Sequence, residues 1–525
     1  MELKGVSIIG AGDGHKGAGF NAVNPATGVA LEPHYSYAST EEINAAVHLA
    51  AEAFPVYSAL SGKKKAEFLR HIANGLETNV AALVERTQLE TALPVPRLKS
   101  EVWRTSGQLR MFADVVEEGS WVNARIDNPD PERKPLPKPD VRSMLRPLGP
   151  VVVFGASNFP FAFSVAGGDT ASALAGGNPV VVKAHLAHPG AGELVGQIVR
   201  ESVRACGLPP GLFSLLYGAG EGIGMQLVEH PSIKAVGFTG SHAGGKALMH
   251  LAASRAEPIP CYAEMGSTNP VFILPKVFKQ KSKEIATGLY GSFTLGSGQF
   301  CTKPGLVFMP KAEETQVFRS EITHLVQESS QQVLLTAGIS DKYSRAVEDR
   351  RADKMTQLVA TSKPAEKHGS SVSVTLFATE AETFQQEKSL EAEVFGPSTL
   401  LIEYQDYSEL LKIASNLEGH LTATLHGTEE ELAACSDLVK ILETKVGRLL
   451  FNGYPTGVEV CHAMIHGGPY PATSDGRSTS VGSQAISRFV RPVCYQNFPD
   501  ATLPDELKNN NPLNILRMVD GVVKK

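Results

Sequence analysis

Three side chains in this sequence have the chemistry needed to form and break a covalent intermediate: a thiol, a carboxylate and an amide. The thiol is Cys301 in GSGQFCTKPG, where glycines on both sides let backbone amides approach a reacting atom. A thiol with a pKa of about 8.5 is mostly protonated at pH 7, so a nucleophilic cysteine needs positive potential nearby. Considered alone, Cys301 is better explained as a buried core residue, so other residues must show whether it is a nucleophile.

Glu264 and Asn158 are the candidates for a general base and an oxyanion donor. Glu264 lies between the apolar stretches CYA and VFIL, and burial there is expected to raise its pKa toward neutrality, as a general base requires. The alternative for Glu264 is a surface charge. Asn158, in GASNFPFAFS, follows a predicted strand and precedes a predicted helix. It either caps that helix or donates its amide hydrogen to a developing oxyanion.

Further polar and glycine-rich stretches lie where predicted strands end, which is where open α/β sheets bind ligands. The stretch VVVK ends one strand, and EVFGP precedes another. The stretch GSHAGG follows a strand and begins a helix, whose N-terminal amides can hold a phosphate. The candidate cofactor contacts in these stretches are Lys183, Gly240, Ser241, Gly245, Glu393 and Phe395.

The N-terminal stretch Gly12 to Gly17 matches the G-x-G-x-x-G pattern of dinucleotide-binding folds. That pattern is informative only between a strand and a helix. Here only a short SII precedes it, and the chain then runs into the turn NPATG. We therefore interpret residues 12–17 as an ordinary glycine-rich loop.

The elements that must position these residues can be predicted from hydrophobic periodicity. The first third is helical, with a capping box (STEE) at Ser39 and helical stretches over roughly 64–90 and 97–117. From Gly149 onward, short β-rich runs alternate with helical patterns, which predicts a parallel sheet covered on both faces. Those helical patterns cover roughly 161–175, 189–205, 221–229 and a stretch after 241. A second alternation after Glu264 predicts a second α/β domain.

Composition excludes several classes of protein. With 49 basic and 55 acidic residues the net charge is −6, so the chain has no electrostatic footprint for nucleic acid or an anionic membrane. Its six cysteines include no C-x-x-C pair, and we predict no metal site. The most apolar region, 147–183, is interrupted by Asn158, Pro160 and Asp169, which favours a buried strand–helix–strand over a membrane span. No signal peptide is recognisable, and a cytoplasmic location is expected.

Taken together, the motifs SNFP, VVVK, GFTGS, E-x-GSTNP, GQ-x-C and EVFGP, in this order, resemble the aldehyde dehydrogenase superfamily from about Asn24 to Pro499. The resemblance implies that Cys301 is the nucleophile and Glu264 the base, while Asn158 and the Cys301 amide form the oxyanion hole. It also implies that the six candidate cofactor contacts bind NAD or NADP. Such enzymes bind the dinucleotide without the usual glycine fingerprint and act on small-molecule aldehydes.

The resemblance implies a fold with two open α/β domains, one Rossmann-like for the cofactor and one catalytic, plus a β oligomerisation flap. The expected boundaries are 1–127 with 147–256 for the dinucleotide-binding domain and 257–466 for the catalytic domain. Residues 128–146 and 467–525 are expected to form the flap and the C-terminal tail. Flap strands would extend a neighbouring subunit's sheet, so a homodimer or homotetramer is expected.

Two departures from the family bear on cofactor and substrate. Many NAD-preferring members carry a glutamate where this chain has Leu186, so NADP should be accepted, because no carboxylate repels its extra phosphate. The C-terminal stretch containing HGGPYPATSD resembles a subgroup that oxidises 2,5-dioxopentanoate to 2-oxoglutarate. That subgroup is also similar to NADP-dependent fatty-aldehyde dehydrogenases, which is the alternative activity.

A carboxylated substrate would need a cationic anchor. Arg104 falls on a helix that borders the substrate tunnel in the family, and its guanidinium could hold a carboxylate with two hydrogen bonds. Arg104 could equally be a solvent-facing helix residue. Phe159, Phe161 and Phe163 are expected to supply apolar walls.

Three other functions are less consistent with these motifs. A CoA-acylating enzyme would generally lack the base at the Glu264 position, and an acyl-phosphate reductase would not carry the complete motif set. A retired dehydrogenase serving as a structural or binding protein would be expected to lose Cys301 or Glu264, and both are present.

Overall fold

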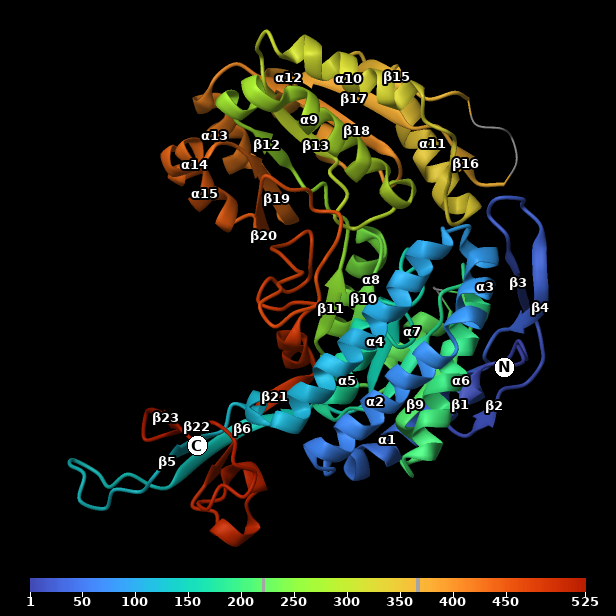
Figure 1. Cartoon of the computed structure of the whole chain (residues 1–525). Helices are drawn as coiled ribbons and strands as arrows, with labels where there is room; N and C mark the ends of the chain where they lie inside the picture. Colours follow the sequence, from blue (N-terminus) through green and yellow to red (C-terminus); the bar gives the residue numbers. More distant parts are fainter. Residues whose placement is uncertain (220–221, 365–368) are drawn as a thin grey trace.

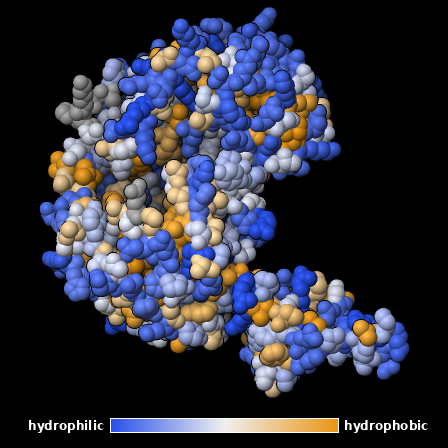
Figure 2. Space-filling model, turned by 180° about the vertical axis from the view of Figure 1, so that it is seen from behind, coloured by the Kyte–Doolittle hydropathy of each residue, from blue (hydrophilic) through white to orange (hydrophobic). Residues whose placement is uncertain are grey.

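The computed structural model describes residues 1–219, 222–364 and 369–525. The chain forms two α/β lobes, one above the other in Figure 1, and an arm of β-strands that projects from the lower lobe. Seen from behind, the arm stands clear of both lobes (Figure 2). The fold class expected from the sequence, two open α/β units plus a separate β-structure, is confirmed.

The lower lobe is built on a seven-stranded sheet. In order across the sheet its strands are β11 (Cys261–Glu264), β10 (Ala235–Thr239), β7 (Val151–Phe154), β8 (Val180–Lys183), β9 (Phe213–Leu216), β1 (Ile8–Ile9) and β2 (Gly12–Asp13). The first five are parallel, and their runs of buried valine and leucine suit a sheet covered on both faces. The hairpin β1–β2 pairs antiparallel at the edge.

The glycine-rich stretch 12–17 lies in and after that edge hairpin, and no helix follows it before α1 begins at Thr40. As expected, the stretch is not followed by the helix N-terminus that a nucleotide fingerprint uses to hold a phosphate.

Four N-terminal helices pack beside this sheet (Figure 1): α1 (Thr40–Ser58), α2 (Gly62–Thr78), α3 (Val80–Thr91) and α4 (Val95–Glu118). The Ser39 capping box is present, with Ser39 and Glu42 satisfying each other's backbone amides. The predicted helix over 64–90 is two helices, because the chain breaks at Asn79, which ends α2 and precedes α3.

The helices between the parallel strands are α5 (Gly168–Gly176), α6 (Pro189–Ala205), α7 (Ile223–Glu229) and α8 (His242–Ser254). The prediction of a helix over 161–175 was wrong at its start, since α5 begins at Gly168 and turns occupy the residues after Phe159. Phe163 N–H bonds to Phe159 O, and Gly168 N–H bonds to Ala162 O, so these turns are closed by local hydrogen bonds.

The upper lobe contains the second seven-stranded sheet. Its strands, in order, are β15 (Gln357–Thr361), β17 (Thr375–Glu380), β18 (Ser398–Tyr404), β13 (Leu306–Pro310), β12 (Val271–Ile273), β19 (His420–His426) and β20 (Val446–Phe451). All neighbours are parallel except β15 and β17. The helices of this lobe are α9 (Pro275–Thr294), α10 (Thr315–Gln327), α11 (Ala337–Ala352), α12 (Ala381–Gln386), α13 (Tyr407–Asn416), α14 (Glu429–Ala434) and α15 (Ser436–Glu443).

The arm is a five-stranded sheet made from two distant parts of the chain. Its order is β21 (Val490–Gln496), β6 (Val141–Pro147), β5 (Arg125–Asp127), β22 (Arg517–Val519) and β23 (Val522–Lys524). The proline-rich residues 128–139 connect β5 to β6 as a loop with one bridge, Asp130 to Lys138. Within the described residues, no helix is both long and apolar enough to cross a bilayer.

Candidate functional site

Cys301 lies where two cavities meet. A cavity of about 530 Å³ is lined by Cys301 together with residues of α4, the loop after β7, β20 and residues 457–464. A second cavity of about 280 Å³ is lined by Cys301 together with Asn158, Glu264 and residues at the ends of β10 and β11. The three residues predicted to carry the chemistry are therefore brought together, and the two cavities reach them from different sides.

The predicted nucleophile and base are joined by a histidine. His466 Nε2 lies 3.4 Å from Cys301 Sγ and 3.0 Å from Glu264 Oε1, and Ser480 Oγ donates to Glu264 Oε2 at 2.8 Å. The side chains of His466 and Glu264 are each 1% exposed. The atoms of Cys301, Glu264 and His466 that could bind a metal lie within 4.8 Å of one another, close enough to contact one ion. The expected absence of a metal site therefore stays a prediction.

The expectation that burial raises the pKa of Glu264 was wrong. Burial does oppose ionisation, but the charge and hydrogen bond of His466, with help from the Ser480 hydroxyl and Arg488, lower the pKa of Glu264 below its ordinary value. The carboxylate is therefore ionised at neutral pH and can accept a proton, although it is a weaker base than predicted.

His466 was missed by sequence reasoning. It begins HGGPYPATSD, a stretch that replaces the usual family loop and whose resemblance to one subgroup pointed only to the substrate. In the structure this segment runs antiparallel beside β11, with Met265 N–H bonded to Ala472 O and Ser474 N–H to Ala263 O. That pairing brings His466 against Glu264, so the signal was a histidine in a segment that replaces a family element.

Asn158 does not cap a helix, since α5 begins ten residues later at Gly168. One N–H of its side-chain amide donates to Gln299 O at 3.1 Å, which lies two residues before the thiol. Its backbone carbonyl accepts from Arg97 Nη2 at 2.7 Å. The amide is thus buried and fixed beside the loop that carries Cys301, in the wall of the second cavity.

The candidate cofactor contacts gather around the second cavity. Gly240, Ser241, Glu393 and Phe395 line it, while Lys183 ends β8 and Gly245 lies in the first turn of α8. Ser241 is the N-cap of α8, so amide groups of this helix N-terminus lie beside the cavity.

Gly245 packs where a larger residue would not fit. A Cβ at this position would lie 2.6 Å from the side chain of Met265. The glycine thus lets α8 pack against the end of β11, next to the cavity wall that Met265 helps to form.

Burial shifts the pKa values of two of the candidate cofactor contacts, Lys183 and Glu393. Burial lowers the pKa of Lys183 to about 8, and among the described residues no carboxylate lies within ion-pair distance of its Nζ. Burial raises the pKa of Glu393 to about 7, against the opposing charge of Lys303. A buried cation without an anion and a carboxyl poised near neutrality are both typical of sites that bind a polar ligand.

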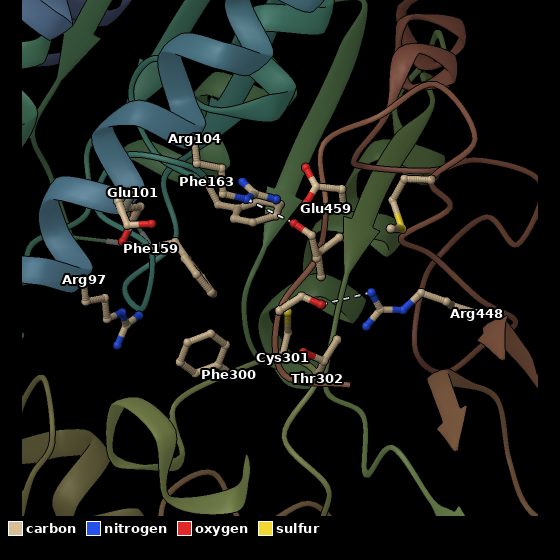
Figure 3. A pocket seen from close by; sticks show the side chains of 14 residues that line it. Arg97, Glu101, Arg104, Phe159, Phe163, Phe300, Cys301, Thr302, Arg448 and Glu459 are labelled. Carbon is tan, nitrogen blue, oxygen red and sulfur yellow. Dashed lines mark hydrogen bonds between the residues drawn. The ribbon is translucent and has the colours of Figure 1, made fainter. Parts of the chain in front are cut away.

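The first cavity has charged and aromatic walls (Figure 3). Arg104, Phe159 and Phe163, predicted from the sequence as substrate contacts, line it. The solvent-facing alternative for Arg104 was therefore wrong. The expectation that Phe161 lines the substrate site was also wrong, because its side chain is 1% exposed and packs in the core of the lower lobe.

Two further arginines line the same cavity and were not predicted: Arg97 from α4 and Arg448 from β20. The Arg97 guanidinium lies beside two adjacent rings, 5.3 Å from the centroid of Phe159 and 4.7 Å from that of Phe300, and the Arg104 guanidinium lies 5.3 Å from the centroid of Phe163. Figure 3 shows Arg97 and Arg448 on opposite sides of the thiol.

Each of these guanidiniums keeps an unused hydrogen-bond donor. Arg104 Nε donates to Val458 O at 3.4 Å, and Arg448 donates to backbone carbonyls at 2.7 and 3.0 Å. In the described part of the chain, Nη1 of Arg97, Nη1 of Arg104 and Nε of Arg448 have no partner. A ligand with several acceptor oxygens would satisfy these buried donors.

Comparisons with known proteins show which family the chain belongs to. The sequence matches the aldehyde dehydrogenase family over residues 13–490. It is 46% identical to alpha-ketoglutaric semialdehyde dehydrogenase 2 of Azospirillum brasilense, covering 99% of both chains. It is 42% identical to alpha-ketoglutaric semialdehyde dehydrogenase of Acinetobacter baylyi, covering 93% of both.

Solved structures share the fold at lower sequence identity. Lactaldehyde dehydrogenase from Escherichia coli superposes with a TM-score of 0.80 at 21% identity, covering 94% of this chain and 98% of that one. Because the family model matches residues 13–490 and both relatives align along nearly their whole length, the chain belongs to the aldehyde dehydrogenase family.

Proposed function

We propose that this protein oxidises 2,5-dioxopentanoate to 2-oxoglutarate with a nicotinamide cofactor. The observation that carries the proposal is the set of three guanidiniums, from Arg97, Arg104 and Arg448, in the cavity that ends at Cys301. A neutral aldehyde needs no such groups, whereas a 2-oxo acid at the far end presents a carboxylate and a ketone oxygen that guanidiniums bind well. The names of both relatives support the same substrate.

In the proposed mechanism, the Cys301 thiolate attacks the aldehyde carbon, and the carbonyl electron pair moves onto oxygen. The second N–H of the Asn158 amide and the Cys301 backbone amide donate to this oxyanion. A bound nicotinamide supplies the hydride acceptor. The thioester left on Sγ is hydrolysed when Glu264 takes a proton from water, whose oxygen attacks the thioester carbon. The C–S bond breaks, and sulfur keeps the electron pair.

The second cavity is proposed to hold the cofactor, because its residues fit such a ligand. Among the described residues Lys183 has no anionic partner, α8 presents its N-terminal amides, and Glu393 and Phe395 form a polar and an aromatic wall. Lys183 and Glu393 suit ribose hydroxyls, and the amides near Ser241 and Gly245 suit a phosphate.

NADP is proposed to be used at least as well as NAD. Leu186 follows β8 in the turn before α6 and places no carboxylate beside Lys183. Leu186→Glu should shift the ratio of kcat/KM values toward NAD, since the new charge repels a 2′-phosphate. Strict NAD use by the wild type would contradict the proposal.

The substrate proposal is tested by steady-state kinetics with matched aldehydes. We expect kcat/KM for 2,5-dioxopentanoate to exceed that for pentanal, which has the same chain length without the acid. Succinic semialdehyde, with a carboxylate but no ketone, should fall between them. A preference for long neutral aldehydes would contradict the proposal and favour the fatty-aldehyde alternative. Failure of every aldehyde would favour a retired enzyme.

The arm is proposed to mediate assembly into a homodimer or homotetramer. Its outer strands β21 and β23 have free edges, and Val522 and Val523 on β23 are each 62% exposed. An exposed apolar edge is stabilised by pairing with another chain. Light scattering of the full chain should give at least a dimer, and a fully active monomer would refute this.

A further inference from the structure

One nitrogen of His466 contacts both groups that the proposed mechanism uses in turn. Nε2 is 3.4 Å from Cys301 Sγ and 3.0 Å from Glu264 Oε1, and the ring is buried. Its other nitrogen, Nδ1, has no hydrogen-bond partner in the described residues. The contacts are thus concentrated on one side of the ring, facing the reacting atoms.

This asymmetry identifies Nε2 as the nitrogen that carries a proton toward the reacting groups, whether or not the ring is also protonated on Nδ1. A buried N–H without a partner is unfavourable, so the tautomer with the proton on Nε2 is preferred, where two acceptors are within reach. One N–H then faces a carboxylate oxygen and a sulfur. A thiolate accepts a hydrogen bond far better than a thiol, so this donor favours the ionised sulfur.

Other groups around the sulfur oppose ionisation on balance. Burial and the charge of Glu264 raise the pKa of Cys301 well above its ordinary value, while Arg104 lowers it. The charged and titratable groups that face the sulfur are Glu264 on β11, Glu393 before β18, Arg104 on α4, Arg448 on β20 and His466 itself. A nucleophilic sulfur in this setting needs a dedicated donor, and His466 Nε2 is the nearest one.

We propose that His466 is a catalytic residue that shares one hydrogen bond between Cys301 and Glu264, stabilising first the thiolate and then the carboxylate. The proposal rests on the thioester mechanism given above. In the free enzyme the thiol proton is released to solvent, the electron pair stays on sulfur, and Nε2–H donates to it. Once sulfur has bonded to the substrate carbon it is a poor acceptor, so Nε2–H donates to Glu264 alone.

The role of His466 in deacylation follows from the hydrogen bonds that Glu264 accepts. With Nε2–H and the Ser480 hydroxyl both donating to it, Glu264 remains ionised in a pocket where burial alone would protonate it. An ionised carboxylate is the form that can accept the proton of water. His466 therefore serves acylation and deacylation without changing its position.

The test measures the ionisation of Cys301 directly, without substrate. Alkylation of Cys301 by iodoacetamide is followed from pH 5.5 to 10 by peptide mass spectrometry in the full-length protein. His466→Ala and His466→Phe, which lack the donor, should shift the midpoint upward by at least about one pH unit, so the rate at pH 7 falls at least about tenfold. The phenylalanine keeps the ring volume and supplies the comparison if the alanine variant does not fold.

Two controls separate a chemical from a structural role. His466→Gln keeps an N–H donor near the Nε2 position and should restore the rate at pH 7 to within a few-fold of wild type. His462→Ala changes an exposed histidine of the same segment and should leave the profile unchanged. A wild-type profile in His466→Phe or His466→Ala would overturn the proposal. Because no aldehyde is added, a wrong substrate assignment cannot produce that result.

Discussion

The two cavities that share Cys301 are built in different ways. The second cavity, proposed for the cofactor, is formed on one side by the ends of β10 and β11 and the turns after β7, β10 and β11, and on the other by α11 and residues 393–395 of the upper lobe. The first cavity, proposed for the substrate, is formed by side chains from α4, the loop after β7, β20 and residues 457–464. Both cavities thus draw on distant segments, but short strand-end motifs supply much of the second cavity and none of the helix and C-terminal side chains of the first.

This difference separates chemistry from specificity. Parallel strands bring their carboxyl ends to one edge, so any motif that ends a strand is delivered to the same place. Side chains that select a substrate have no such rule and depend on how a helix and a C-terminal segment pack. Variants at Cys301, Glu264 or Asn158 should therefore disable the chemistry, while variants elsewhere in one cavity should affect only the cofactor or only the substrate.

Cys301→Ala is expected to have the largest effect. Turnover should fall by at least about 10³-fold, because no thioester can form. Binding of NADP, measured by fluorescence titration, should stay within a few-fold of wild type, since the second cavity keeps its other walls. Appreciable aldehyde oxidation by this variant would remove Cys301 from its proposed role.

Glu264→Gln is expected to come next, with a steady-state loss of about 10²- to 10⁴-fold, the range typical of a general base. A stopped-flow trace should still show a first-turnover burst of reduced cofactor and then stall, because the thioester is not hydrolysed. Loss of the burst as well would mean that Glu264 acts before hydride transfer.

Arg104→Leu tests the substrate side alone. KM for 2,5-dioxopentanoate should rise about 10- to 100-fold, because a hydrogen bond to a charged group contributes about 1.5–3 kcal/mol. KM for pentanal should change little, and KM for the cofactor should not change. Arg110→Leu is the matched control, because Arg110 lies on the same helix but pairs with Glu77 at 2.7 Å. Equal effects on both aldehydes would show that Arg104 is not an anchor.

The same contrast explains which features the sequence predicted. The Ser39 capping box and the strand ending at Lys183 depend on residues within a few positions, and both were located correctly. The start of α5 was not, because turns after Phe159 use apolar residues that also suit a helix. Local pattern alone cannot distinguish these two arrangements.

The errors at the site all involve partners far along the chain. Glu264 was expected to be a strong base because its neighbours in sequence are apolar, but its pKa is lowered by His466 and Ser480, some 200 residues away. Arg448 was missed because only the packing of β20 brings it to the cavity. Such contacts have no periodic signal and need the tertiary structure.

The smallest expected effect concerns the pH dependence of cofactor binding, which should depend on Glu393 and Lys183 and not on residues of the first cavity. Burial raises the pKa of Glu393 to about 7 and lowers that of Lys183 to about 8. Glu393 accepts hydrogen bonds from ribose hydroxyls most strongly when it is ionised, above about pH 7, and Lys183 is mostly charged below about pH 8. NAD is the suitable probe, because it has no 2′-phosphate to titrate.

Affinity for NAD should therefore be greatest between about pH 7 and 8, with Kd rising about tenfold on lowering the pH to 6, as expected for one proton taken up by the free enzyme. Glu393→Gln cannot titrate, so it should bind more weakly at pH 7.5 and lose the acid limb while the basic limb due to Lys183 remains. Arg104→Leu, which alters the other cavity, should keep both limbs. A flat wild-type profile of Kd between pH 6 and 7.5 would show that Glu393 does not contact the cofactor. Another residue of the second cavity would then have to bind the ribose hydroxyls.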